Sequence, residues 1–385
     1  MDIWSNAVHW LVNFWDYVVV FLFILTVVVF VHELGHFLVA RWAGVRVEVF
    51  SIGFGPELFG WTARSGTRWK VSVLPFGGYV KMFGDADAAS TPDLGRQFTE
   101  EEAKYAFPAK KVGYRAAIVA AGPLANFVFG IVAMAIMFMV YGEPRTAPVI
   151  GQVQADSAAA EAGLQSGDRI LQANGQTVDR FQDLQRVVRM TVGEAVSLRV
   201  QRSGQILTVV AQPRITEIKD SFGNLHKTPV LGIVADAEAT EFLSHGPLSA
   251  LAAATRETGE MVSTTLTGLG QMLTGRRQTD ELGGPLRIAK GAGQAAKLGL
   301  SSVIFYTILL SINLGLINLF PVPLLDGGHL MFYGIEALKG RPLGARAQEY
   351  GFRVGLILVF ALMLLATRND LVDLRVWELL KGLIS

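Results

Sequence analysis

The chain of 385 residues contains no cysteine. This absence excludes disulfide bonds, cysteine zinc fingers, iron–sulfur clusters and a thiol nucleophile. Charged side chains make up only 17% of the residues, and 34 basic residues against 33 acidic ones leave a net charge of +1. So small a charge provides no cationic field for nucleic acid, and we expect no nucleic-acid partner. Histidine is also scarce, with six residues, so any bound metal must draw its ligands from His, Asp, Glu or Asn.

Apolar residues are abundant instead, at 51% of the chain, and the mean hydropathy is +0.38. Four apolar stretches are long enough to cross a bilayer as helices. The N-terminus has neither a basic residue ahead of the first stretch nor a small-residue cleavage site after it, so we expect that stretch to be retained. We predict an α-helical polytopic membrane protein in contact with the lipid bilayer, with four transmembrane helices at residues 17–40, 116–140, 301–320 and 351–367.

The basic residues near these stretches predict the orientation of the chain. Lys and Arg concentrate in cytoplasmic loops close to the ends of spans. The loop between the first two stretches and the loop between the last two carry this excess, so we expect both to face the cytoplasm, with both termini and residues 142–300 on the other side. The basic residues concerned are Arg41, Arg46, Lys110, Lys111, Arg115, Lys339, Arg341 and Arg346.

Two segments between the spans have the alternation and glycine punctuation of strands. Residues 46–82 predict a membrane-associated β-rich loop, because their apolar content exceeds that of an ordinary cytoplasmic loop. Residues 147–236 predict a small β-rich domain, and 247–273 an amphipathic helix at the outer interface. The expected organisation is an N-terminal membrane region (1–142), an inserted domain (143–240), an amphipathic linker region (241–300) and a C-terminal membrane region (301–385).

The inserted domain resembles the PDZ domains of bacterial proteases, on the stretch G-L-Q-S-G-D-R-I-L-Q-A-N-G at residues 163–175 and on P-V-L-G-I-V at 229–234. The resemblance implies that Leu231, Gly232 and Ile233 form a strand that binds a peptide tail edge-on, with backbone N–H groups near Gly232 available to a terminal carboxylate. The alternative is a domain that only spaces or plugs and binds no tail.

The first span ends in the sequence His32-Glu33-Leu34-Gly35-His36. A helix places residues four apart on one face, so both imidazoles can reach one metal ion beside Glu33. Ionisable groups at membrane depth are costly, which favours a functional site over a structural cluster. Catalytic zinc takes about three protein ligands and keeps a position open for water, so one ligand is missing from this span.

Asp326 is the best candidate for the third ligand. It follows the third span in N-L-F-P-V-P-L-L-D-G, where Pro321 and Pro323 interrupt the helix and allow a carboxylate to turn inward. His329, three residues further on, is the rival ligand. We favour Asp326 because an anionic ligand also offsets the charge of the zinc ion.

The chain resembles the site-2 protease family of intramembrane zinc metalloproteases, specifically the bacterial RseP type (regulator of sigma-E protease), over nearly its whole length. The resemblance implies one catalytic zinc held by His32, His36 and Asp326, with Glu33 as general base and Asn318 positioning or stabilising the reacting carbonyl. The motifs that carry it are H-E-L-G-H, F-S-I-G-F-G-P (50–56), L-P-F-G-G-Y-V-K-M (74–82), G-P-L-A-N-F (122–127), the PDZ-like region and N-L-F-P-V-P-L-L-D-G-G-H (318–329).

The same resemblance implies a setting and a substrate. The enzyme would be a multi-pass protein of the bacterial inner membrane, acting in regulated intramembrane proteolysis near the cytoplasmic side. Its substrates would be single-span proteins such as an anti-sigma factor or a remnant signal peptide, presented as an added strand by the loop at 46–82. One departure is that familiar members of this type have two tandem PDZ domains, whereas the length here accommodates one.

Other functions fit the sequence less well. An aspartyl protease needs two facing carboxylates at membrane depth, and a serine type would show a nucleophile motif such as G-x-S-x-G, which the sequence lacks. A metal-ion transporter using His32, His36 and Asp326 would show repeated halves and further intramembrane charges. An inactive scaffold that carries a PDZ domain would tolerate the loss of Glu33, which is present.

Overall fold

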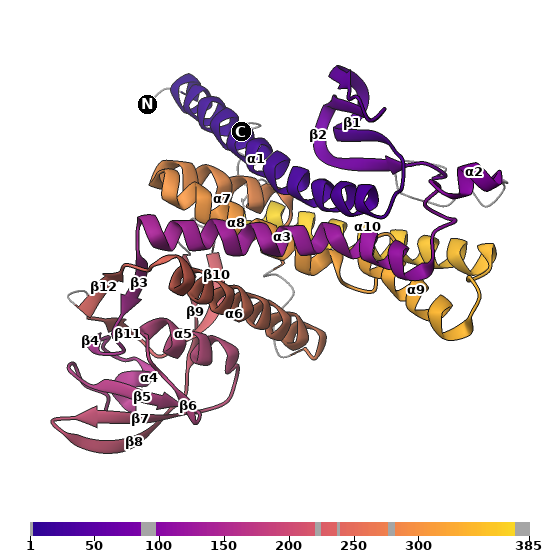
Figure 1. Ribbon diagram of the computed structural model, residues 1–385. Coiled ribbons are helices and arrows are strands. Elements are labelled where there is room, and N and C mark those ends of the chain that lie inside the picture. The colour runs from indigo at the N-terminus through magenta and orange to yellow at the C-terminus, as the bar shows by residue number, and fades with distance from the viewer. Residues whose placement is uncertain (1–2, 86–97, 220–224, 237–238, 276–281, 374–385) are drawn as a thin grey trace. The chain divides into compact units, whose positions relative to one another are not determined.

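The computed structural model describes residues 3–85, 98–219, 225–236, 239–275 and 282–373 (Figure 1). The chain divides into two compact units: unit 1 comprises Met1–Ala133 with Gly284–Asp370, and unit 2 comprises Met134–Gly283 with Leu371–Ser385. Unit 2 therefore holds both the inserted domain and the helix expected at 247–273. The domain bounds predicted at residues 142, 240 and 300 stay predictions.

Long helices build most of unit 1, because its sequence consists largely of apolar stretches with few interior charges. Among the described residues, four helical segments are long and apolar enough to cross a membrane: Tyr17–Trp42, Val112–Val140, Leu300–Asn318 and Arg346–Val372. They coincide with the four apolar stretches expected to span the bilayer. The helices of this unit are α1 (Ile3–Trp42), α2 (Glu100–Ala103), α3 (Val112–Val140, which continues into unit 2), α7 (Pro285–Leu298), α8 (Leu300–Asn318), α9 (Asp326–Lys339) and α10 (Ala345–Asp373).

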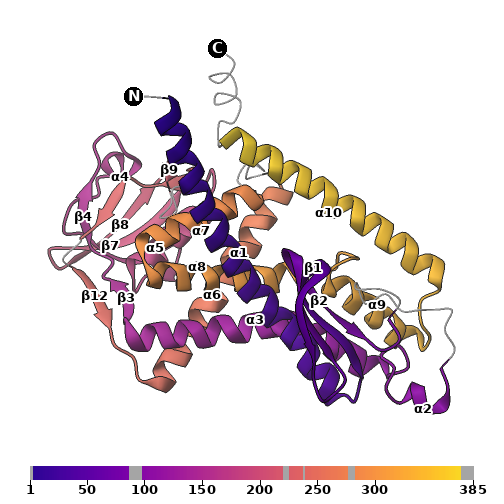
Figure 2. The ribbon, with the colours of Figure 1, turned by 90° about the horizontal axis from the view of Figure 1, so that it is seen from above.

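The expected β-rich loop is an antiparallel hairpin of β1 (Val47–Thr62) and β2 (Arg68–Met82), which lies beside the C-terminal half of α1 (Figure 2). The hairpin curls over itself, because Phe50 pairs with both Trp69 and Val80. Residues 49–52 thus pair with residues 68–71 on one side and with residues 78–81 on the other. Residues 78–82 therefore form one edge of the curled sheet.

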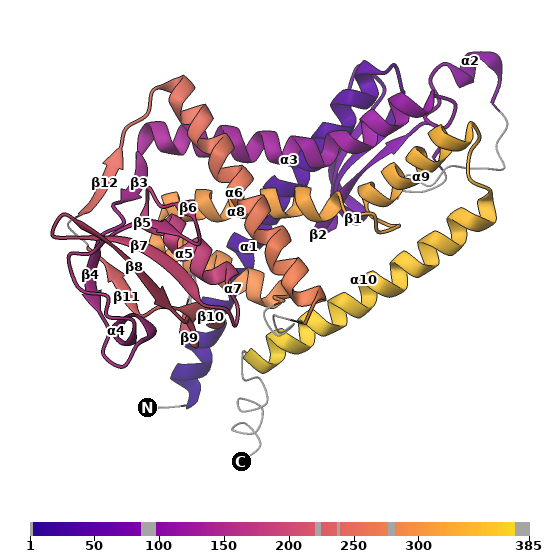
Figure 3. The same cartoon turned by 90° about the horizontal axis from the view of Figure 1, so that it is seen from below.

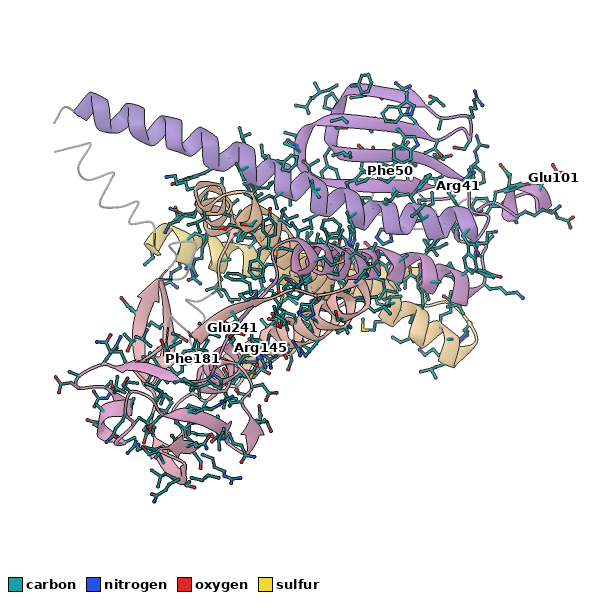
Figure 4. All side chains as sticks on the ribbon, turned by 60° about the vertical axis from the view of Figure 1, so that its left-hand side comes forward. Arg41, Phe50, Glu101, Arg145, Phe181 and Glu241 are labelled. Atoms are coloured by element: carbon teal, nitrogen blue, oxygen red, sulfur yellow. The ribbon has the colours of Figure 1, made fainter. Side chains whose placement is uncertain are left out.

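Aromatic packing fixes this hairpin to α1. The rings of Phe50 and Trp69 are stacked with centroids 4.2 Å apart, and Phe37 of α1 meets both rings edge-on at 5.7 and 5.1 Å. Phe50, labelled in Figure 4, is fully buried. Such aromatic pairs add about 0.5–1.5 kcal/mol each beyond the burial of their apolar area. The hairpin is therefore held rigidly against the helix that carries the His32-to-His36 motif.

The third span ends at a break in the helix, as the prolines predicted. α8 stops at Asn318 and α9 begins at Asp326, so the residues between them, including Pro321 and Pro323, lie outside regular helix. Leu324 adopts φ = 122°, a conformation that costs a non-glycine residue steric strain. The break turns the chain and places the first residue of α9 next to α1.

Unit 2 contains the predicted β-rich region, with a four-stranded antiparallel sheet in the order β6-β5-β7-β8 and two-stranded pairs β4–β11, β3–β12 and β9–β10 (Figure 3). Its core includes Ile170, Phe181, Leu184 and Leu198. The elements are β3 (Glu143–Thr146), β4 (Ile150–Val153), α4 (Ala158–Glu161), β5 (Arg169–Ala173), β6 (Gln176–Thr177), α5 (Phe181–Met190), β7 (Val196–Arg202), β8 (Gln205–Ala211), β9 (Arg214–Lys219), β10 (Leu225–Val230), β11 (Ile233–Ala235), β12 (Thr240–Leu243) and α6 (Pro247–Leu273).

Candidate metal centre

Two histidines of α1 lie one helical turn apart and share one face, as their spacing predicted. His32 and His36 are each only 8% exposed. Their Nε2 atoms are 3.2 Å apart and their ring centroids 4.8 Å apart. The two rings therefore direct one nitrogen each toward the same small volume.

Asp326, at the start of α9, reaches this volume from the other side of the helix break. Its Oδ2 atom lies 3.1 Å from Nε2 of His32 and 3.6 Å from Nε2 of His36. Among the described residues, these three side chains form the one group of His, Asp or Glu with the geometry of a metal site. The structure thus brings together three residues separated by almost 300 positions in the sequence.

The spacing of the three atoms fits a tetrahedral zinc site. With zinc–ligand distances of about 2.0–2.1 Å, neighbouring ligand atoms of a tetrahedron lie about 3.3–3.4 Å apart. The observed separations are 3.1, 3.2 and 3.6 Å. Two imidazole nitrogens and one carboxylate oxygen are also ligands that zinc accepts, and they leave the fourth position of the tetrahedron open.

A close contact with α3 orients the ring of His36. Its Nδ1 atom lies 2.9 Å from the carbonyl oxygen of Ile118 and must donate to it, because a carbonyl only accepts. The Nε2 lone pair of His36 consequently faces the site. Gly122 is required here, since a Cβ atom at that position would lie 2.3 Å from Nε2 of His36. Gly35 is equally constrained, because its Cβ would meet the carbonyl oxygen of Ala121 at 2.2 Å.

His32 has a partner in α3 that the sequence analysis assigned no role. The side-chain amide of Asn126 is fully buried, and its Nδ2 atom lies 3.2 Å from Nδ1 of His32. A signal was present in the sequence, because Asn126 is the one strongly polar residue in the apolar stretch 116–140. Polar side chains inside spans usually face a partner within the protein.

A cavity opens beside the three converging side chains. Glu33 and Asn318, the predicted general base and carbonyl-stabilising residue, both line it, as do residues 77–80 of β2 and Tyr333 of α9. His329 also lines the cavity, but it is absent from the group of three, and its ring packs 5.4 Å from that of Phe352. The geometry therefore favours Asp326 over His329 as the third member of the cluster.

The three residues predicted to bind a peptide tail belong to unit 2, where Leu231 and Gly232 connect β10 to β11 and Ile233 begins β11. The carbonyl oxygens of Leu231 and Gly232 accept hydrogen bonds of 2.8 Å from the backbone N–H groups of Ala159 and Gln154. Gly232 has φ = 78° and a Cβ there would meet Ser157 at 2.3 Å. β11 pairs with β4. A role of Leu231, Gly232 and Ile233 in peptide binding stays a prediction.

Comparison with known proteins gives a match to the profile of Peptidase family M50 over residues 20–362. A relative from Agrobacterium fabrum, which carries the provisional name of zinc metalloprotease, is 47% identical over 93% of this chain and 96% of its own length. The metalloprotease MmpA of Caulobacter vibrioides is 37% identical over 97% of this chain and all of its own.

The regulator of sigma-E protease RseP from Salmonella typhimurium is 33% identical over 91% of this chain and 97% of its own length. That alignment extends over 444 positions, more than the 385 residues of this chain, so the relative contains segments that this chain lacks. A solved PDZ domain from an SdrC-like protein of Listeria innocua is 22% identical over 23% of this chain and 92% of its own length, with a TM-score of 0.19.

Proposed function

The chain belongs to peptidase family M50 and is a zinc metalloprotease, and from this premise we propose that it cleaves peptide bonds inside the membrane, within the spans of single-span proteins. The observation that carries the proposal is the convergence of His32, His36 and Asp326 on one point beside Glu33, in a helix apolar enough to span a bilayer. The four apolar helices and the relationship to RseP indicate a multi-pass protein of the inner membrane.

His32, His36 and Asp326 are the proposed ligands of one zinc ion, and their spacing supports this set. When bound, zinc would act as a Lewis acid that polarises a carbonyl, and it would lower the pKa of a water molecule to about 7. His329 is not among the proposed ligands, because its ring packs against that of Phe352. We therefore propose that His329 has a packing role at the cavity wall.

Glu33 is the proposed general base. Its carboxylate accepts a proton from the attacking water and then delivers that proton to the leaving amine. Its place in the cavity wall, one residue after His32, supports this role. Asn318 lines the same cavity at the end of α8 and can donate a hydrogen bond from its amide to the oxygen of the carbonyl under attack.

The edge of β2 is the proposed surface for the substrate backbone. A helical substrate hides its carbonyl groups in internal hydrogen bonds, so it must unwind before cleavage, and pairing with a strand edge compensates for the bonds lost. Residues 77–80 of β2 line the cavity, and residues 78–80 pair with β1 along one edge of the strand. This arrangement supports the presentation of the substrate as an added strand.

The proposed orientation puts the basic loops in the cytoplasm and both termini with residues 143–240 on the extracytoplasmic side. The cleavage site then lies toward the cytoplasm, because His32 and His36 are near the C-terminal end of α1. Since the chain has no cysteine, single substitutions report topology cleanly. In intact cells, an impermeant thiol reagent should label Ala195→Cys before Lys339→Cys, and the reverse order would refute this orientation.

The inserted domain is proposed to be a PDZ domain that binds the shortened outer tail of the substrate. The printed name of the RseP relative, regulator of sigma-E protease, supports a substrate of the anti-sigma-factor kind, with a remnant signal peptide as the second candidate. Ile233→Glu should weaken binding of a tail peptide or alter the size selectivity of cleavage. The matched control is Val234→Glu, at the next position, where the side chain is 46% exposed. Equal behaviour of the two variants would favour a spacer.

The experiment that tests the proteolytic assignment compares wild-type protein with Glu33→Gln, purified in detergent and given a synthetic transmembrane peptide. Removal of the general base should lower the cleavage rate by at least about 10³-fold, within the range for acid–base catalysis. Bound zinc, measured on the same samples, should stay unchanged. Glu48→Gln, in β1 of the same unit, is the control and should cleave normally. Zinc binding by the wild type without cleavage would favour a scaffold.

A further inference from the structure

Asn126 is a buried amide on α3 that contacts a proposed zinc ligand from the side opposite the metal. Its Nδ2 atom lies 3.2 Å from Nδ1 of His32, whereas the Nε2 atom of the same ring faces His36 and Asp326. Asn126 is 0% exposed. Its Oδ1 atom is buried and has no hydrogen-bond partner among the residues that the structure describes.

The backbone around Asn126 is fixed by its neighbours. The hydroxyl of Ser311 on α8 donates to the backbone carbonyl of Asn126 at 3.1 Å. Gly315, one turn further along α8, packs so closely that a Cβ there would lie 3.2 Å from the Cβ of Asn126. The side chain therefore cannot move far, but its terminal amide can turn by half a rotation and exchange Oδ1 with Nδ2.

The two amide orientations impose different protonation patterns on the imidazole of His32. If Nδ2 points at the ring, Nδ1 must accept and the proton sits on Nε2, where it can donate to Nε2 of His36 at 3.2 Å. If Oδ1 points at the ring, Nδ1 carries the proton and donates it to Asn126. The Nε2 lone pair of His32 is then directed at the cluster, as a metal ligand requires.

We propose that Asn126 is a positioning residue that selects the zinc-binding tautomer of His32. With zinc bound, Oδ1 of Asn126 accepts the Nδ1 proton of His32, which requires the amide orientation in which Oδ1 faces the ring. The role is parallel to that of the Ile118 carbonyl, which fixes the tautomer of His36. The assignment depends on the proposed zinc site. Because Oδ1 makes no hydrogen bond to any described residue, no contact of Oδ1 opposes the turn of the amide that brings it to face His32.

The test measures zinc affinity of the purified full-length protein by competition with a chromophoric chelator, independently of cleavage. Asn126→Ala removes the acceptor and should weaken zinc binding by about 10- to 100-fold, the range seen when a partner of a ligating histidine is lost. Asn126→Asp keeps an acceptor of nearly the same shape and should hold zinc within a few-fold of wild type. Ser311→Ala removes a hydrogen bond to the backbone of Asn126 only, so it is the matched control.

The outcomes separate this inference from the proposed function. Zinc affinity of Asn126→Ala equal to that of Ser311→Ala would overturn the positioning role, and so would an equal loss in Asn126→Asp and Asn126→Ala. Failure of the proposed function would show in the wild type instead, as the absence of stoichiometric zinc. Melting temperatures of the zinc-free proteins identify a variant that fails to fold. If Asn126→Ala does not fold, the zinc affinity of Asn126→Asp relative to wild type tests the positioning role by itself.

Discussion

Two of the clusters of buried ionisable side chains among the described residues are built on opposite principles. In unit 2, the guanidinium of Arg180, with a side chain 8% exposed, donates to four carboxylates at 2.9–3.1 Å: those of Glu143, Asp183, Glu257 and Glu260. In unit 1, His32, His36 and Asp326 direct two ring nitrogens and a carboxylate oxygen at one another.

The two clusters differ in whether their acidic groups are balanced by basic side chains. In addition to Arg180, the cluster contains Arg186 and Arg256, which form further ion pairs, and Nε2 of His245 lies 2.8 Å from Oε2 of Glu143, so each acid of the cluster has a basic partner. Burial lowers the pKa of the Arg180 guanidinium, but Asp183 and Glu257 outweigh burial and raise that pKa above its ordinary value. The cluster in unit 1 holds three potential electron-pair donors and one formal negative charge, so a cation would complete it. The proposed metal centre thus differs from the structural network in that its donors converge without a basic side chain to balance them.

The largest expected effect comes from removing the carboxylate of the proposed metal centre. If His32, His36 and Asp326 bind zinc as proposed, Asp326→Ala leaves two protein ligands, so the affinity for zinc should fall by at least about 10²-fold, more than the loss of an outer partner causes, and peptide cleavage should be abolished. Metal analysis after dialysis against a chelator measures the change. His329→Ala should keep its zinc. Full occupancy in Asp326→Ala would instead assign the third ligand to His329.

A smaller effect, confined to unit 2, is expected from breaking the Arg180 network. Arg180→Leu leaves buried carboxylates without their shared cation, a change that costs about 3–5 kcal/mol. Hydrogen exchange of the α5 and α6 amides in the full-length protein should accelerate, while zinc content stays the same. Arg189→Leu, at an exposed position of α5, should leave the exchange unchanged. Equal protection in both variants would show that the network adds no stability.

The smallest expected effect is a pH dependence in unit 2. Burial raises the pKa of Asp168, but hydrogen bonds from Arg202 and from the backbone N–H of Gln165 outweigh burial and hold that pKa below its usual value of 3.8. A depressed carboxyl pKa adds stability above the unfolded value, and this stability disappears as the pH falls through the folded pKa.

Arg202→Gln should therefore lower the unfolding free energy of unit 2 at neutral pH, and the deficit relative to wild type should shrink as the solution is acidified below pH 4 or so. Chemical unfolding followed across that range measures the difference. Arg214→Gln breaks an ion pair with Glu161 whose side chains are 49% and 65% exposed, and should change stability by less than about 1 kcal/mol. A deficit of Arg202→Gln that persists unchanged at low pH would contradict the assignment.

The sequence predicted the features that depend on local pattern. Four apolar stretches located the spans, alternation located the hairpin at residues 46–82, and Pro321 with Pro323 located the break before Asp326. The spacing of His32 and His36 sufficed to place both rings on one helical face, because the geometry of one turn of helix is fixed.

The features that the sequence did not predict depend on contacts between distant segments. Glu143 and Arg180 are 37 positions apart, and Glu257 lies in a helix that composition alone assigned to a linker region. Asn126 was part of a motif used for the family resemblance, yet its contact with His32 spans 94 positions. The contact arises where α1 and α3 cross, and Gly35 and Gly122 leave room for this crossing because neither has a side chain.

The glycines in the cavity wall have a consequence for selectivity. Where β2 lines the cavity, Gly77 and Gly78 contribute main-chain atoms and no side chains, next to Tyr79 and Val80. If the substrate pairs with this strand as proposed, contacts at the two glycines depend on whether its backbone is extended and not on which residue it carries there. We therefore expect helix-weakening residues near the scissile bond, such as Gly or Pro, to govern turnover more than any consensus sequence.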